Sequence, residues 1–215
     1  MQSMVLESIK RHRIISILRG FTTEDAVRLA EALYLGGIRL IEVTFEQGLD
    51  EQDTVQSIGM IAALGHSDLL VGAGTVMTKE QAELAREAGA KYLISPNING
   101  EVIAYAKAHG LISLPGAMTP SEVAYAYTLG ADIVKLFPCS VLGPSYIKAI
   151  QAPLRHIPLA AVGGITLDNM AEYFDAGVCC VGIGSNLASN RLVRAGAFNE
   201  ITQLANAYAA KAHKV

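Results

Sequence analysis

Four polar side chains stand late in otherwise apolar runs of this 215-residue sequence. They are Arg19, Glu42, Thr75 and Lys135. Lys135 lies in IVKLFP (133–138), where strand alternation puts it on the face of Ile133 and Phe137. Burial disfavours the charged form of a lysine and lowers its pKa, and the neutral amine is the form that attacks a ketone to give an iminium. The sequence therefore predicts that Lys135 is a covalent nucleophile and that the site needs no metal and no cofactor.

Glu42, in the run LIEVTF (40–45), shares a strand face with Leu40 and Thr44. As part of a lysine site, its carboxyl group would carry protons to the carbinolamine and the aldol hydroxyl, directly or through one water. Two other interpretations stay open at this point. Glu42 and Lys135 could form a buried structural ion pair, or Glu42 could bind a metal ion.

Glycine-rich turns follow two late apolar runs, in AVGGIT (161–166) and VGIGSN (181–186). In α/β barrels the loops after the seventh and eighth strands often hold a phosphate, which backbone N–H groups and a helix N-terminus can bind. Either turn alone could simply reverse the chain, but the pair favours a phosphate site. The glycines of VGAGT (71–75) are a weaker signal, because they could only make room in the barrel mouth.

The elements that must position these groups alternate along the chain. Eight short apolar runs lie at 14–19, 40–45, 69–76, 92–96, 111–116, 133–138, 158–164 and 179–184. Amphipathic segments between them, such as 22–37, 78–89, 119–130 and 166–177, open with a threonine cap and close on glycine. This pattern predicts an α/β fold, a (β/α)8 TIM barrel, with an extra N-terminal helix in VLESIKRHR that closes the barrel bottom. An open doubly wound sheet is the alternative.

Length and composition fit a single domain over residues 1–215, with 51% hydrophobic and 17% charged residues. A net charge of -3 without a basic run argues against nucleic acid and anionic membranes as partners. We expect a cytoplasmic protein, because neither a signal segment nor a membrane span is visible. Three cysteines without CxxC spacing and five dispersed histidines suggest neither disulfides nor a metal site.

Taken together, the motifs ILRGFTTEDA, IEVTF, VGAGTV, ISPNI, LPGAMTP, VKLFP, AVGGIT and GIGSNL resemble the family of 2-keto-3-deoxy-6-phosphogluconate (KDPG) and 4-hydroxy-2-oxoglutarate (KHG) aldolases. The match runs in order over almost the entire chain. The resemblance implies a class I, Schiff-base lyase that acts on a phosphorylated keto acid and releases pyruvate and glyceraldehyde 3-phosphate. It also implies a homotrimer.

The resemblance assigns roles to individual residues. Lys135 matches the Schiff-base lysine, Glu42 the proton shuttle and Thr75 a contact to the pyruvoyl carboxylate, while Pro96 lines the site. The residues that match the phosphate-binding turns are Gly163, Gly164, Gly184 and Ser185.

Two positions depart from the phosphogluconate branch of the family. An arginine that grips the substrate carboxylate there is absent from IEVTFEQ, which has Glu46 and Gln47 instead, so we assign that role to Arg19. Val162 replaces the usual threonine. Together with ILRG, SPNI and FPCSVLGPSYIKA, this apolar residue favours the 2-dehydro-3-deoxy-6-phosphogalactonate branch or relaxed selectivity at C4.

Other activities remain possible from the sequence. A KHG aldolase would act on a substrate without a phosphate group. A phosphate-binding barrel isomerase or epimerase would use Glu42 as the base for enolisation and would form no imine. A non-catalytic sensor of a phosphorylated metabolite would show no turnover. A metal-dependent pyruvate aldolase would lose activity to a chelator.

Overall fold

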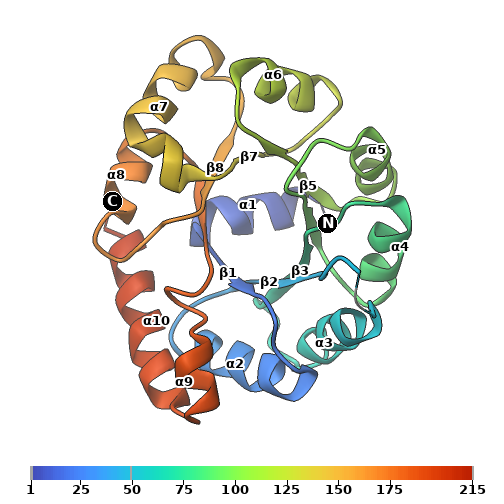
Figure 1. Cartoon of the computed structure of the whole chain (residues 1–215), viewed down its shortest axis with the longest axis vertical. Helices are drawn as coiled ribbons and strands as arrows, with labels where there is room; N and C mark the ends of the chain where they lie inside the picture. The colour runs from blue at the N-terminus through green and yellow to red at the C-terminus, as the bar shows by residue number, and fades with distance from the viewer. Residues whose placement is uncertain (1, 49, 215) are drawn as a thin grey trace.

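A computed structural model of the protein describes residues 2–48 and 50–214; Met1, Leu49 and Val215 of the predicted single domain lie outside the described residues. In the described part, nine parallel strands form a nearly closed barrel that helices surround (Figure 1). The strands are β1 (Ile14–Leu18), β2 (Leu40–Thr44), β3 (Leu70–Gly74), β4 (Tyr92–Ile94), β5 (Ile112–Leu114), β6 (Gly116–Ala117), β7 (Val134–Leu136), β8 (Leu159–Val162) and β9 (Cys180–Ile183). The predicted (β/α)8 barrel class is confirmed.

The one difference in strand number lies at the predicted fifth run, 111–116, which forms two strands. The sheet order is β5-β4-β3-β2-β1-β9-β8-β7-β6, so β5 pairs only with β4 and β6 only with β7. Pro115 separates them because it has no N–H to donate to a ladder. Its carbonyl accepts from the backbone N–H of Lys135 at 2.9 Å. The two ends of the sheet, β5 and β6, are therefore joined by the continuous backbone through Pro115 and not by a ladder of hydrogen bonds.

Strand alternation divides the apolar side chains into two cores. Residues such as Val134 and Leu136 pack outward with the surrounding helices, whereas Ile133 and Leu40 belong to a separate cluster inside the barrel. Ile9 of α1 is fully buried in the inner cluster. In Figure 1, α1 crosses the barrel, and it closes one end as predicted.

Apart from α1, the helices form the outer ring of the barrel (Figure 1). The helices of the described residues are α1 (Gln2–His12), α2 (Thr23–Leu35), α3 (Gln52–Ala62), α4 (Lys79–Glu87), α5 (Gly100–Ala108), α6 (Pro120–Thr128), α7 (Cys139–Leu154), α8 (Met170–Asp175), α9 (Asn190–Arg194) and α10 (Phe198–Ala212). α7 is kinked at Gly143, where φ is 69°. None of the helices in the described ranges is long and apolar enough to cross a membrane.

Three of the four predicted threonine caps are confirmed. Thr22, Thr78 and Thr119 each accept a hydrogen bond from a backbone N–H in the first turn of the next helix. The fourth is wrong, because Thr166 accepts from the N–H of Asn169 in a turn that precedes α8.

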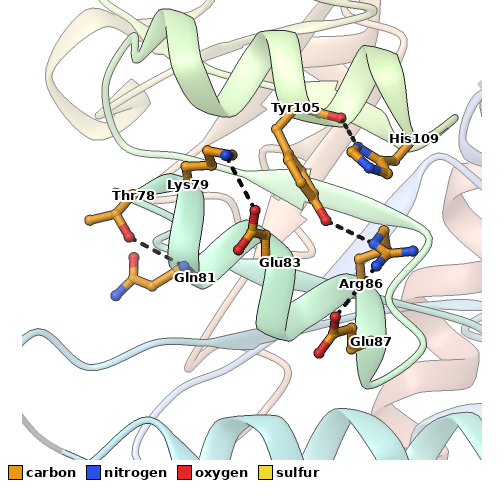
Figure 2. Close-up of polar contacts among 8 residues, drawn as sticks. All are labelled: Thr78, Lys79, Gln81, Glu83, Arg86, Glu87, Tyr105 and His109. Atoms are coloured by element: carbon orange, nitrogen blue, oxygen red, sulfur yellow. Dashed lines mark hydrogen bonds and ion pairs between the residues drawn. The ribbon is translucent and has the colours of Figure 1, made fainter.

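Figure 2 shows how two neighbouring outer helices, α4 and α5, are fixed to each other. Arg86 of α4 donates from Nε to the hydroxyl of Tyr105 of α5 at 2.8 Å, and the Tyr105 ring stacks on His109 with centroids 4.0 Å apart. These contacts join α4 to α5 in the outer ring.

Candidate active site

One cavity of about 560 Å³ opens at the carboxyl ends of the strands, the end opposite α1. It is lined by all ten residues that the sequence predicts for the site. These are Arg19, Glu42, Thr75, Pro96, Lys135, Val162, Gly163, Gly164, Gly184 and Ser185. The structure thus brings together residues from seven of the strands and the loops that follow them.

Lys135 lies in the middle of β7 and points into the barrel, because Val134 and Leu136 on either side of it pack outward. Its side chain is only 6% exposed. Its Nζ lies 4.8 Å from the centroid of the Phe137 ring. Burial lowers the pKa of the Lys135 amine below its ordinary value of 10.5. The charge of Arg19 lowers this pKa further, whereas that of Glu42 raises it.

Glu42 lies in the middle of β2 and is 2% exposed. Burial raises the pKa of its carboxyl group, although the charges of Lys135 and Arg19 oppose that rise. Its Oε2 atom is buried and has no hydrogen-bond partner in the described part of the chain. A buried oxygen of this kind is costly unless a ligand satisfies it, so its place in the cavity suits a group that exchanges protons with a bound molecule.

The glycines of β3 make room for two large inward side chains. A Cβ atom at Gly74 would collide with the carboxyl group of Glu42, and one at Gly72 would collide with the ring of Tyr92. Tyr92 is fully buried and donates its hydroxyl to the Ile41 carbonyl at 2.6 Å. The interpretation of VGAGT as a strand that makes room in the barrel is therefore correct.

Lys135 and Glu42 face the same cavity but form no ion pair within 4.0 Å; the pairs among residues 2–48 and 50–214 involve other groups. The simple structural ion pair is therefore not observed. Because burial is the main cause of both pKa shifts, it favours a free amine on Lys135 and a protonated carboxyl on Glu42. Those two forms are a nucleophile and a general acid.

Arg19 directly follows β1, and Thr75 directly follows β3. The Nη2 atom of Arg19 donates to the Thr75 hydroxyl at 3.1 Å. The guanidinium group is exposed at the cavity, where it can provide positive charge next to a hydroxyl donor. This pair can bind an anion such as a carboxylate.

The predicted phosphate turns follow β8 and β9. Gly163 and Gly164 have φ angles of 100° and 75°, and a Cβ at Gly164 would lie 2.8 Å from the Cβ of Ser140. Glycine is therefore required for this turn. The Gly164 carbonyl accepts from Asn169 at 2.9 Å, and the Ile165 carbonyl accepts from Asn186 at 2.8 Å.

Several residues of the cavity were not predicted as part of the site. They are Ile17, Phe137, Ile165, Gly182, Asn186, Ala188 and Asn190. Strand alternation could have found Ile17 and Phe137, which stand two positions from Arg19 and Lys135 on the same faces. Asn186 directly follows the GIGS turn, so its motif gave a signal as well.

Comparison with known proteins gives one consistent family. A family model described as "KDPG and KHG aldolase" matches residues 5–204. The chain is 36% identical over 203 residues to a 2-dehydro-3-deoxy-phosphogluconate aldolase of Treponema pallidum, covering 93% of both proteins. It is 38% identical over 175 residues to a 2-dehydro-3-deoxy-6-phosphogalactonate aldolase of Escherichia coli, covering 81% of this chain and 83% of that one.

Among solved structures, the KDPG aldolase of Legionella pneumophila superposes with a TM-score of 0.85 at 29% identity. The match covers 94% of this chain and 97% of that one. Pyruvate was captured in that crystal as a covalent carbinolamine intermediate.

Proposed function

Because the chain belongs to the KDPG and KHG aldolase family, we propose that it cleaves a 2-keto-3-deoxy-6-phospho sugar acid reversibly to pyruvate and glyceraldehyde 3-phosphate, with Lys135 as its nucleophile. The protein is a class I, Schiff-base aldolase. One observation carries the residue assignment: Lys135 and Glu42 are both buried and line the same cavity, yet they form no ion pair with each other.

The reaction begins when the free amine of Lys135 attacks the C2 carbonyl carbon of the substrate. A proton from Glu42 converts the carbinolamine hydroxyl into water, which leaves, and an iminium forms. As the C3–C4 bond breaks, the iminium accepts its electron pair and Glu42 takes the proton of the C4 hydroxyl. The aldehyde departs, the enamine takes a proton at C3, and water hydrolyses the imine to release pyruvate.

The two ends of the substrate are anionic, and the cavity has matching groups at two places. Arg19 and the Thr75 hydroxyl bind the carboxylate of the pyruvoyl end. The turns at Gly163–Gly164 and Gly184–Ser185 bind the phosphate through their N–H groups. Pro96 lines the cavity wall.

Val162 sets the preference at C4. It is buried at the end of β8 and packs over Gly182, where a Cβ would lie 2.9 Å from its Cγ2 atom. An isopropyl group there has no hydroxyl with which to bind a C4 hydroxyl. We therefore expect a preference for the phosphogalactonate epimer or little discrimination between the two epimers.

The quaternary structure and location belong to the same proposal. We expect a homotrimer, and the exposed apolar side chains of Met118, Tyr125 and Val141, on or beside the adjacent helices α6 and α7, offer surface for subunit contact (Figure 1). Light scattering should then give three times 22.8 kDa. A cytoplasmic location stays a prediction from the sequence.

Borohydride reduction in the presence of pyruvate tests the chemistry. We expect one pyruvate-derived adduct, mapped by peptide mass spectrometry to Lys135, and none in Lys135→Met. An unmodified Lys135 in a protein that still cleaves the substrate would contradict the assignment. Side-by-side assays of the two phosphorylated epimers and of 4-hydroxy-2-oxoglutarate would then define the substrate.

A further inference from the structure

Thr75 has an unusual backbone at the edge of the active site. Its φ angle is 56°, in the left-handed region that β-branched residues rarely adopt. Such a conformation costs on the order of 1–3 kcal/mol and persists only where the surrounding structure enforces it. The groups that hold this segment therefore decide where the Thr75 hydroxyl points.

Three side chains hold the three successive carbonyls that begin at Thr75, one from the loop after β2 and two from the loop after β4. The amide of Gln47 donates to the Thr75 carbonyl at 3.1 Å. The hydroxyl of Ser95 donates to the Val76 carbonyl at 2.7 Å, and the amide of Asn99 donates to the Met77 carbonyl at 2.9 Å. The backbone N–H of Val76 also donates to the Ile94 carbonyl of β4 at 3.1 Å, so side chains and one backbone bond together fix the segment.

The Thr75 side chain is held as well. Its hydroxyl oxygen accepts from Nη2 of Arg19 at 3.1 Å. A hydroxyl has a single hydrogen, and because the oxygen serves as acceptor for Arg19, that hydrogen can be donated to an anion in the cavity. Gln47 on the backbone and Arg19 on the side chain therefore fix Thr75 at both ends.

We propose that Gln47 is a positioning residue for the pyruvoyl carboxylate, acting through the Thr75 carbonyl to keep the Thr75 hydroxyl directed at the bound acid. This role rests on the proposed function, in which Thr75 contacts that carboxylate. Gln47 ends the segment IEVTFEQ, which has no arginine of its own. In this chain the segment acts on the carboxylate indirectly, and Arg19 provides the charge.

The test is Gln47→Met, which keeps the length of the side chain but removes the amide donor. The pyruvate half-reaction is followed alone, as exchange of the pyruvate methyl hydrogens with deuterium in D2O. We expect the KM for pyruvate to rise about five- to tenfold while kcat stays within about twofold. Gln47→Glu, whose ionised carboxylate cannot donate, should raise KM at least as much.

A matched control comes from the far side of the barrel. Gln151 also donates from its amide to a backbone carbonyl, that of Gly177, at 3.3 Å. Gln151→Met removes the same kind of bond and should leave the KM for pyruvate unchanged. An equal rise in KM in this control would overturn the role of Gln47.

A double-mutant cycle separates positioning from stability. In Thr75→Gly the hydroxyl is gone and the positive φ costs nothing, so adding Gln47→Met should not raise KM further. A full additional rise in KM, or a lower Tm of Gln47→Met without any change in KM, would overturn the proposal. Borohydride trapping of the wild-type protein at Lys135 is scored separately, so a failure of the proposed function is distinguishable from a failure of this inference.

Discussion

The inner face of the barrel has two regions, a floor and a mouth. The same strands contribute to both, with residues that lie two positions apart in the sequence. Near α1, the floor consists of apolar side chains such as Leu40 and Ile133. One step further along the same strand faces stand Glu42 and Lys135, at the mouth. The floor gains free energy by burying apolar surface, whereas the mouth buries ionisable groups at a cost. Stability and chemistry are therefore separated by position along the strand, as is general for this fold.

The largest expected effect is the loss of activity when the mouth residue of β7, Lys135, is replaced. Lys135→Met should lower the rate of cleavage by at least about 10⁴-fold, because the nucleophile is lost. It should leave Tm unchanged or higher, because a buried amine is removed. Steady-state assays and thermal unfolding of the same preparations check both expectations.

The matched change at the floor is Ile133→Ala. Truncation of this fully buried side chain should cost about 2–5 kcal/mol of unfolding free energy. Folded Ile133→Ala protein should still form the borohydride-trapped adduct. A folded Ile133→Ala variant that forms no adduct would contradict the separation of stability at the floor from chemistry at the mouth.

The next effect concerns proton transfer at β2. Glu42→Gln should lower kcat by about 10²–10³-fold and change pyruvate binding much less, because the carboxyl acts on protons rather than on affinity. The Glu42 charge raises the pKa of Lys135, so its removal should also shift the acidic limb of the trapping profile to lower pH. If turnover survives with only the pH shift, Glu42 is an electrostatic neighbour and not the proton shuttle.

The paired glycines of β3 give a smaller and sharper comparison. Gly74→Ala pushes against the Glu42 carboxyl, and Gly72→Ala pushes against the Tyr92 ring. Each should cost about 1–3 kcal/mol of stability by overpacking, but only Gly74→Ala should also lower kcat in the protein that remains folded. Equal kcat values per folded molecule would argue against this account.

The smallest effect is electrostatic. Arg19 lowers the pKa of Lys135, so Arg19→Met should raise that pKa and move the trapping profile at saturating pyruvate toward higher pH. The shift is limited because the Arg19 side chain is exposed to solvent. A shift toward lower pH would mean that the charge of Arg19 does not act on the amine.

Much of this site follows from local sequence rules. The alternation around Lys135 and Glu42 predicts their inward direction, and the position of the glycine pairs after late strands predicts the turns at the mouth. What was missed depends on contacts between distant segments. The split at Pro115 results from pairing with β7, and the positive φ of Thr75 is held by residues as far away as Gln47. No pattern within either segment contains that information.

The most direct measurement is the pH dependence of borohydride trapping of pyruvate at Lys135 in the wild-type protein, read as the fraction of the Lys135 peptide modified after a fixed short time. The pKa of Lys135 lies below 10.5 because the amine is buried. Trapping should therefore rise with pH, and its midpoint should lie below pH 10.5. A midpoint at or above pH 10.5 would mean that the amine is solvated and charged, and would contradict the assignment of Lys135 as a nucleophile whose pKa is lowered by burial.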